Sequence, residues 1–257
     1  EPDFEPGDYP GMRLDPAARA ELAGHLLSPQ LKQRKLATRI LDWDHNWDKP
    51  ENPLAVLADP KAARAISGVA WHCYNGDVPA MERVRAAHPD KEAFVTECSG
   101  GEWLADWGKV LEWMTDSLII APTRYGSRGT LLWNLALDEN HGPHLGGCGD
   151  CRGVVTVDSQ SGDVRRNVEY YVLGHASRFV RPGARRIASS EAEGLANVAF
   201  RNSDGSLVLI AHNRGAASLT VTVSEGSRSF VHELPAGEVE TFVWQETSAG
   251  WHKAGRR

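Results

Sequence analysis

A carboxylate ends one of the short apolar segments of this chain. In FVTECSGGEW, residues 94–103, the run Phe94-Val95 leads to Glu97, and a loop with two glycines follows. A structural carboxylate would more often lie on a helix surface. Glu97 therefore either caps a neighbouring element or takes part in chemistry.

Three other segments end in side chains that could act together with Glu97. Strands are predicted over residues 36–43, 68–74, 93–97 and 129–135. The polar and aromatic residues on or just after the other three strands are Asp44, His45, Asn46, Trp47, His72, Tyr74, Trp133 and Asn134. In a (β/α)8 barrel such strand ends converge on one mouth, where active sites are found. In the alternative interpretation, Asp44 and Asn46 cap a turn, and His72 and Tyr74 are satisfied polar groups of the core.

The elements between these strands predict an α/β fold. Helices are expected over residues 15–27, 60–66, 79–87, 103–120 and 167–179. Two of them start with Asp-Pro, an N-cap followed by proline in the first turn, and the longest shows apolar residues spaced three and four apart. The strands are short and uniformly apolar, which is typical of parallel strands covered on both faces. Either a doubly wound sheet or a (β/α)8 barrel fits this pattern.

The pattern changes after Pro182. Short alternating strands such as SLVLIAHN and SLTVTVS are separated by turns rich in glycine and asparagine. This pattern predicts a small antiparallel β domain. We therefore divide the chain into residues 1–182 and residues 183–257, and we expect the two parts to pack tightly.

A carboxylate among Trp, Tyr, His and Asn side chains at a barrel mouth suggests glycoside hydrolysis. That chemistry needs two carboxyl groups on opposite sides of the glycosidic bond. One attacks the anomeric carbon or activates the water that does, and the other protonates the leaving oxygen. Glu97 is the first candidate.

Composition limits the partners that can be expected. The formal net charge is −6, and Lys and Arg form no run except at residues 253–257, so nothing supports a nucleic-acid partner. No apolar stretch approaches the roughly 20 residues that a membrane span needs, and no signal peptide is visible. The chain begins on Glu1 rather than Met, so we expect it to be a piece of a longer protein.

The four cysteines fall into two pairs. Cys73 and Cys98 lie in or beside apolar runs and are predicted to be buried thiols. Cys148 and Cys151 form a Cys-x-x-Cys close to His141. A zinc site, a local disulfide and free thiols all remain open for this second pair.

Several stretches together resemble one family. LDWDHNWD, GVAWHCY, FVTECSGGEW, LLWNLALDENHGP, CRGVVTVD and YYVLGHASRFVRPGARRI, in this order, are similar to the C-terminal two thirds of glycoside hydrolase family 30. Lysosomal glucosylceramidase and β-1,6-glucanases belong to that family. The resemblance implies the C-terminal half of a (β/α)8 TIM barrel, strands five to eight, followed by a β-sandwich.

The resemblance also points to the second carboxylate. In the family, the acid/base is the glutamate of an Asn-Glu-Pro motif after the fourth barrel strand, and a Tyr-Pro follows a few residues later. Here Glu1-Pro2 precedes Tyr9-Pro10, so Glu1 is the expected acid/base. Glu5-Pro6 is the competing pair, but Phe4 precedes it instead of Asn. The N-terminal half of the barrel is then missing from these residues, and we expect the isolated piece to be poorly soluble or inactive.

The family resemblance assigns the remaining roles. Glu97 is expected to act as nucleophile and Glu1 as acid/base in a retaining double displacement, without metal or cofactor. Tyr74 would donate to Glu97, His72 would hold the acid/base, and Trp133 would form a sugar platform. The subsites would be lined by Asp44, His45, Asn46 and Trp47. Glucosylceramidase lacks Asp-His-Asn-Trp at that point, which puts ceramide specificity in doubt.

The resemblance leaves three interpretations of the function open. The expected substrate is a β-linked glucoside, either glucosylceramide-like or a β-1,6-glucan. A β-xylosidase or another barrel glycosidase is the first alternative. A non-catalytic carbohydrate-binding protein on the same scaffold is the second. The substrate class leads us to expect a secreted or cell-envelope protein.

Overall fold

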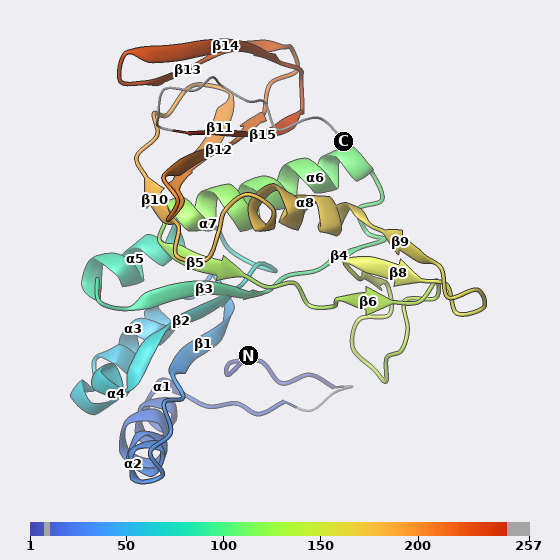
Figure 1. Ribbon diagram of the computed structural model, residues 1–257. Helices are drawn as coiled ribbons and strands as arrows, with labels where there is room; N and C mark the ends of the chain where they lie inside the picture. Colours follow the sequence, from blue (N-terminus) through green and yellow to red (C-terminus); the bar gives the residue numbers. More distant parts are fainter. Residues whose placement is uncertain (8–10, 246–257) are drawn as a thin grey trace.

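The computed structural model describes residues 1–7 and 11–245. Tyr9-Pro10 lies outside the described residues, as does the end of the predicted second domain, 246–257. Within the described part, a parallel sheet with its helices is followed by a β-sandwich (Figure 1).

The central sheet has four parallel strands in the order β1-β2-β3-β5. The strands are β1 (Ile40–Asn46), β2 (Ile66–His72), β3 (Glu92–Glu97) and β5 (Ser127–Thr130). Their consecutive order and parallel direction are those of one half of a (β/α)8 barrel.

Three of the predicted strands have wrong bounds. The first strand begins four residues later than expected and includes Asp44, His45 and Asn46. The second covers Ile66–His72 instead of residues 68–74, so Tyr74 lies past its end. The fourth covers Ser127–Thr130 instead of residues 129–135. Beyond Thr130, backbone bonds from Leu131 N to Val95 O and from Trp133 N to Cys98 O continue along β3 without a regular ladder. Alternate residues such as Leu131 are exposed there, so the apolar run does not mark a buried strand.

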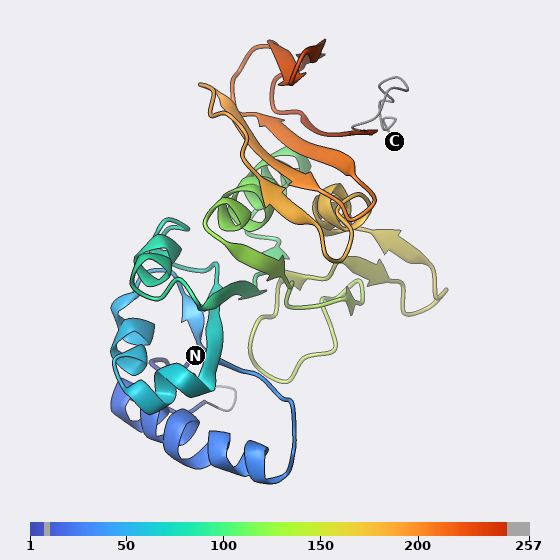
Figure 2. The ribbon, with the colours of Figure 1, turned by 60° about the vertical axis from the view of Figure 1, so that its left-hand side comes forward.

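Two groups of helices pack around the sheet. The group that precedes β3 in the chain contains α1 (Pro16–Ala20), a π-helical turn (Glu21–Leu27), α2 (Ser28–Gln33), α3 (Glu51–Leu57), α4 (Pro60–Ala65) and α5 (Ala80–Ala87). Between the sheet and the sandwich lie α6 (Trp107–Met114), a π-helical segment (Thr115–Ile120), α7 (Ala121–Arg124) and α8 (Val168–Ser177). Figure 2 shows this second layer against the lower face of the sandwich.

Capping explains where the helices start. Asp15 and Asp59 each accept bonds from backbone N–H groups of the first turn, which confirms both predicted Asp-Pro starts. The helix expected from Trp103 begins at Trp107, because Asp106 caps it by accepting from Lys109 N at 2.9 Å.

The second part is an antiparallel β structure, as predicted. One sheet has the order β10-β11-β12-β15, and β13-β14 form a hairpin. The strands are β10 (Arg185–Ile187), β11 (Leu195–Arg201), β12 (Ser206–Asn213), β13 (Leu219–Glu225), β14 (Arg228–Leu234) and β15 (Val239–Gln245).

The two parts share one apolar core. Val198 and Ile210 of the sandwich belong to the same buried cluster as Met114 and Leu118 of the barrel helices. Polar contacts cross the same boundary: His175 bonds Thr241 Oγ1 at 2.9 Å, and His212 bonds an oxygen of Asp116 at 2.9 Å. The two parts therefore form a tightly packed unit.

Short strands organise the long loop that follows β5. A three-stranded sheet contains β6 (Ala136–Leu137), β8 (Val155–Val157) and β9 (Val164–Arg166). A two-stranded pair joins β4 (Gly100–Gly101) to β7 (Cys151–Arg152).

Both cysteine pairs form disulfides, Cys73–Cys98 and Cys148–Cys151. The prediction that Cys73 and Cys98 are free thiols is wrong. The sequence showed only that both cysteines lie in or beside apolar runs. This position predicts burial, but it does not show which two strand ends lie side by side. In the second pair, bridged sulfurs are not available as the thiolates that zinc requires.

Candidate active site

His72 lies at the centre of the polar group at the carboxyl ends of β1, β2 and β3. Its Nδ1 is 3.4 Å from Glu1 Oε1, and its Nε2 is 3.1 Å from Asp44 Oδ1 and 3.9 Å from Glu97 Oε2. The imidazole is only 3% exposed. One buried ring thus contacts three carboxylates, two of which are the predicted catalytic pair.

The two predicted catalytic carboxyl groups face each other across His72. An oxygen of Glu1 and an oxygen of Glu97 lie within 4.8 Å of one another, together with a nitrogen of His72. Their side chains are 25% and 22% exposed, so solvent or a ligand can reach both. The competing Glu5 is 62% exposed and pairs with Arg13 at 3.7 Å, away from this group.

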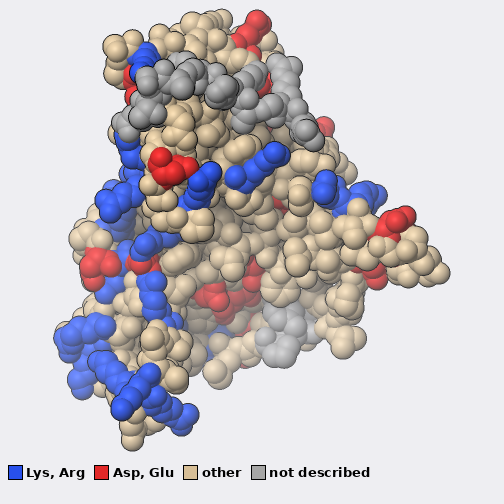
Figure 3. Space-filling view, viewed as in Figure 1, with Lys and Arg blue, Asp and Glu red and all other residues tan. Residues whose placement is uncertain are grey.

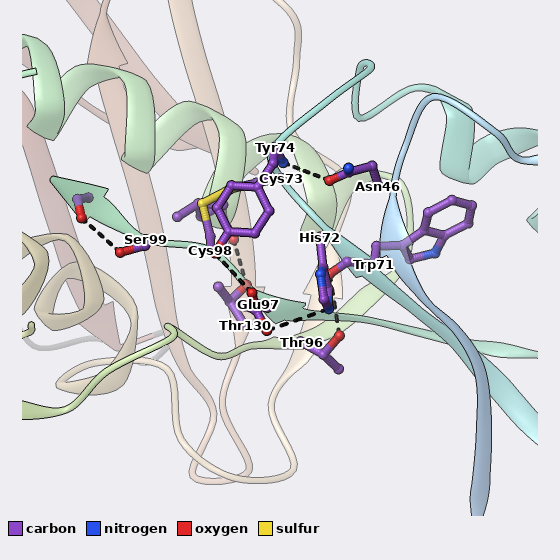
Figure 4. The surroundings of a disulfide bond; sticks show 12 residues. Asn46, Trp71, His72, Cys73, Tyr74, Thr96, Glu97, Cys98, Ser99 and Thr130 are labelled. Atoms are coloured by element: carbon purple, nitrogen blue, oxygen red, sulfur yellow. Dashed lines mark hydrogen bonds and ion pairs between the residues drawn. A yellow bond between two sulfur atoms is a disulfide. The ribbon is translucent and has the colours of Figure 1, made fainter. Parts of the chain in front are cut away.

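Tyr74 donates its hydroxyl to Glu97 Oε1 at 3.1 Å, as the family resemblance implied (Figure 4). The ring of Tyr74 meets the ring of His72 edge to face, with centroids 6.1 Å apart. The residue is held a second time by its backbone N–H, which donates to Asn46 Oδ1 at 3.0 Å.

Asp44 reaches this group because β1 is irregular at its carboxyl end. The β1–β2 register jumps from the pair Trp43↔Ala70 to the pair His45↔Trp71, so Asp44 is the extra residue of a bulge. Trp43 and Asp44 both adopt left-handed backbone angles, with φ of 77° and 51°. Such angles are costly for residues other than glycine and concentrate at functional sites.

The three residues that follow Asp44 contact other site residues or the apolar core. His45 is bonded through Nδ1 to Asp3 at 2.5 Å, and its Nε2 is 3.8 Å from Glu1. Asn46 holds the backbone of Tyr74. Trp47 is 2% exposed and belongs to the apolar core. The structure therefore brings Asp44 to the cavity wall, whereas His45, Asn46 and Trp47 do not line the cavity.

A cavity of about 1130 Å³ opens beside Glu1 and Glu97. Its wall includes Tyr74, Trp133 and Asn134, part of the loop 141–148, and both cysteines of the Cys148–Cys151 disulfide that follows this loop. Trp133 is 53% exposed, so its ring is available to a ligand. Figure 3 shows acidic side chains gathered in a hollow near the middle of the face seen in Figure 1.

Burial and neighbouring groups perturb two of these carboxylates in opposite directions. Burial raises the pKa of Glu97; His72 and the Tyr74 bond oppose the rise, and the negative charges of Glu1 and Asp44 add to it. The hydrogen bond from His72, helped by that from Thr96, lowers the pKa of Asp44 to about 2. Asp44 therefore supplies a fixed negative charge, while Glu97 is the carboxylate whose protonation is sensitive to its surroundings.

Glu1, His72 and Glu97 are also the one group among the described residues with atoms close enough to hold a metal ion. The same atoms are engaged with each other and with Tyr74 and Asp44. Glycoside hydrolysis by two carboxyl groups uses these atoms directly. The expectation that no cofactor takes part stays a prediction.

Sequence reasoning missed three features of the site. Asp3 bonds His45 and also pairs with Lys49, and only the acidic segment before Tyr9 could have pointed to it. Arg19 lies on the cavity wall and forms a buried pair with Asp42 at 2.9 Å. Disulfide Cys73–Cys98 joins the strand ends that carry Tyr74 and Glu97.

Family models match both parts of the molecule. Residues 19–180 match the glycosyl hydrolase family 30 TIM-barrel domain, and residues 183–242 match the family 30 β-sandwich domain. The chain belongs to glycoside hydrolase family 30. The predicted fold, a TIM-barrel portion followed by a β-sandwich, is confirmed for this family 30 chain.

Individual relatives agree with the family assignment. An endo-1,6-β-D-glucanase of Trichoderma harzianum is 30% identical over 249 residues, which cover 91% of this chain and 48% of the relative. The lysosomal acid glucosylceramidase of Mus musculus is 29% identical over 208 residues, with 74% and 39% covered. A solved endo-β1,6-glucanase structure superposes with a TM-score of 0.89 at 30% identity, covering 96% of this chain and 57% of that one.

The family 30 chain spans about half the length of the curated relatives that it matches. No helix among residues 1–7 and 11–245 combines the length and the apolar character that crossing a membrane requires.

Proposed function

We propose that the protein is a retaining β-glycosidase, with Glu97 as nucleophile and Glu1 as acid/base. The observation that carries this proposal is the proximity of the two carboxyl groups, since one oxygen of Glu1 lies within 4.8 Å of one oxygen of Glu97. Retaining glycosidases hold their two carboxyl groups about 5 to 5.5 Å apart, whereas inverting enzymes leave about 6.5 to 9.5 Å for a water molecule. The spacing favours direct attack on the sugar over attack by an interposed water.

In the first step, a Glu97 oxygen bonds to the anomeric carbon while the glycosidic carbon–oxygen bond breaks. Glu1 gives its proton to the leaving oxygen. In the second step, Glu1 takes a proton from water, the water oxygen bonds to the anomeric carbon, and the bond to Glu97 breaks. Two inversions give net retention of the β configuration.

The contacts of the site fit this division of roles. Glu97 must be ionised to attack, and the Tyr74 hydroxyl and His72 both favour its charged form. His72 lies between the two carboxyl groups, with one ring nitrogen within 4 Å of each. The exposed ring of Trp133 offers a flat apolar surface for the CH face of a sugar.

We propose a β-1,6-linked glucan as the substrate class. Endo-1,6-β-D-glucanases of three fungi align with 91%, 94% and 95% of this chain. The mouse glucosylceramidase aligns with 74%. The two disulfides also support a location outside reducing compartments, in agreement with secretion or the cell envelope.

The test uses the full-length protein that contains this chain and a mechanism-based trap, such as a cyclitol epoxide related to β-glucose. Peptide mass spectrometry is expected to find the adduct on Glu97, and early NMR spectra of the released sugar are expected to show the β anomer. The Glu102→Gln variant, with an altered carboxylate in the following loop, is the matched control and should still be labelled at Glu97.

Other outcomes separate the alternatives. An adduct on Glu1 would mean that the two roles are exchanged. A folded protein that binds glucosides but is neither labelled nor active would support the binding-protein interpretation. Comparison of β-1,6-glucan, glucosylceramide and xylan as substrates tests the substrate class, and faster turnover of either of the last two would contradict it.

A further inference from the structure

We propose that the Cys73–Cys98 disulfide is a positioning element of the active site, which holds the Tyr74 hydroxyl on Glu97 and links this contact to Trp133. The proposal rests on the function proposed above. It assigns to these two cysteines a role in the reaction geometry, beyond joining two strands.

The disulfide begins where the hydrogen-bonded ladder ends. The last paired residues of β2 and β3 are His72 and Glu97. The next residue on each strand is a cysteine, and the two Cα atoms are 5.4 Å apart. The covalent bond therefore continues the alignment of the two strands by one residue past the last backbone pair (Figure 4).

Tyr74 depends on this extension because it lies beyond the ladder. It is 45% exposed, so surrounding side chains enclose only part of it. Its backbone N–H is bonded to Asn46, and its hydroxyl reaches Glu97. Cys73 precedes Tyr74 and Cys98 follows Glu97, so the disulfide connects the direct neighbours of the donor and the acceptor.

Cys98 also connects this pair to the third element of the site. Its carbonyl accepts the backbone N–H of Trp133 at 2.8 Å, in a region where β5 has already ended. A displacement of Cys98 would move Trp133 and Glu97 together. The disulfide thus lies at the junction of the three segments that supply Tyr74, Glu97 and Trp133.

The environment of the disulfide fits a fixed connection. Cys73 is 8% exposed, and Cys98 is fully buried in the main apolar cluster. Cys148–Cys151, in contrast, lies in a loop of the cavity wall, and neither of its cysteines is adjacent in sequence to Tyr74 or Glu97. It offers a second disulfide of the same chain for comparison.

Loss of the connection should have a signature in the pH dependence. Described groups that act on Glu97 are His72 and Tyr74, which favour its charge, and Glu1 and Asp44, which oppose it. If the Tyr74 hydroxyl moves away, the charged form of Glu97 loses a hydrogen bond. The acidic limb of the kcat/KM profile then moves to higher pH, which a change in global stability alone would not produce.

The experiment compares Cys73→Ala/Cys98→Ala, Tyr74→Phe and the combined variant in the full-length protein. A hydrogen bond to a charged group contributes enough to predict a roughly 10- to 100-fold fall in kcat/KM for each. Both are expected to shift the acidic limb upward. The combined variant should be little worse than either, because the disulfide acts through Tyr74.

Two controls distinguish positioning from stability. Val221→Ala, in the remote β13–β14 hairpin, should lower the melting temperature without moving the acidic limb. In the Cys148→Ala/Cys151→Ala variant, Cys73–Cys98 is the remaining disulfide of this chain. A dithiol should reduce it to two thiols while the dithiol itself becomes a cyclic disulfide. The degree of reduction is counted by alkylation and mass spectrometry, and it should parallel the shift of the limb even if the alanine variant fails to fold.

The outcomes separate the two proposals. Wild-type turnover and labelling of Glu97 are measured first on the same preparation, and their absence overturns the proposed function. With both present, an unchanged acidic limb in the folded Cys73→Ala/Cys98→Ala variant overturns the positioning role. Fully additive effects of the disulfide and Tyr74 substitutions would overturn it as well.

Discussion

Thr96 donates a hydrogen bond to Asp44 at 2.6 Å, and each of these residues is the extra residue of a β-bulge. The two bulges lie on β1 and β3, on either side of β2. Together they advance Glu97 to the level of His72 and turn Asp44 toward the same ring. The geometry of the site thus depends on two irregularities that meet in one hydrogen bond.

The Asp44→Asn variant should lose stability at neutral pH. The pKa of Asp44 falls from 3.8 to about 2 in the folded protein, because His72 and Thr96 bond its charged form. The full shift corresponds to about 2.4 kcal/mol, and solvent screening of its largely exposed side chain reduces this to roughly 1 kcal/mol. Because the folded pKa is lowered, the contribution is complete above pH 3.8 and is lost as the pH falls toward 2.

Urea unfolding of wild type and Asp44→Asn at pH 7 and pH 2 measures this difference. The two proteins should differ at pH 7 and converge at pH 2. Asp77→Asn, at an exposed position after β2, is the control for loss of one charge. A gap between wild type and Asp44→Asn that stays constant over this range would show that Asp44 acts through packing and not through its charge.

The Glu97→Gln variant should be inactive but more stable at neutral pH. Burial and the charges of Glu1 and Asp44 raise the pKa of Glu97 above its usual 4.5. For a group whose folded pKa is raised, the stabilising contribution is present below the unfolded pKa and is lost as the pH rises through the folded pKa. Wild type should therefore fall behind Glu97→Gln in melting temperature as the pH increases from 4 to 7.

Calorimetry over that range, with Glu102→Gln as a matched neutral substitution, tests the expected trend. Glu102 is half-exposed and pairs with Arg152, so its replacement should not reproduce the trend. Equal melting temperatures of wild type and Glu97→Gln at every pH would contradict the electrostatic cost assigned to ionised Glu97.

Glu1 and Glu5 should respond differently to substitution by alanine. Loss of general acid/base assistance from Glu1 should slow hydrolysis of glucosides with poor leaving groups roughly 10²- to 10⁴-fold. Aryl glucosides, whose leaving group needs little protonation, should still form the glycosyl-enzyme. Added azide needs no general base, so it should restore turnover and yield a β-glycosyl azide.

Glu5→Ala is the control, because Glu5 is exposed and paired with Arg13 outside the site. It should retain wild-type rates and show no azide effect. Azide rescue of Glu5→Ala instead of Glu1→Ala would exchange the assignment of the acid/base.

The parallel strands and their common end could be predicted because they rest on local patterns, whereas Glu1 followed only from the family resemblance, and the catalytic roles of Glu1 and Glu97 stay predictions. Apolar runs ending in Glu97 and His72 indicated parallel strands and a common mouth, and both residues lie there. The exact position of Asp44 could not be predicted, since a bulge adds one residue without altering the apolar pattern. The pairing of Cys73 with Cys98 could not be predicted either, because it follows from the register of β2 against β3.

The tryptophans illustrate the same distinction. Trp47 follows the first predicted strand, and Trp133 lies near the end of the fourth. The sequence offers no signal that distinguishes the environments of the two side chains. Trp47 turns into the core at 2% exposure, whereas Trp133 lies at the cavity with half its surface free. The direction of a side chain just past a strand end depends on the local backbone path, which residue types alone do not determine.

Trp133→Ala should weaken substrate binding more than it slows the chemical step. Its ring lies on the cavity wall, and its backbone is fixed by the Cys98 carbonyl, so the stacking surface is preorganised. A contact of about 0.5 to 1.5 kcal/mol predicts a roughly 2- to 12-fold rise in KM, with Trp133→Phe between alanine and wild type. Trp113→Ala, on the exposed side of α6, is the matched control and should leave KM unchanged. If Trp133→Ala instead lowers kcat at constant KM, the ring contributes to the transition state and not to a binding platform.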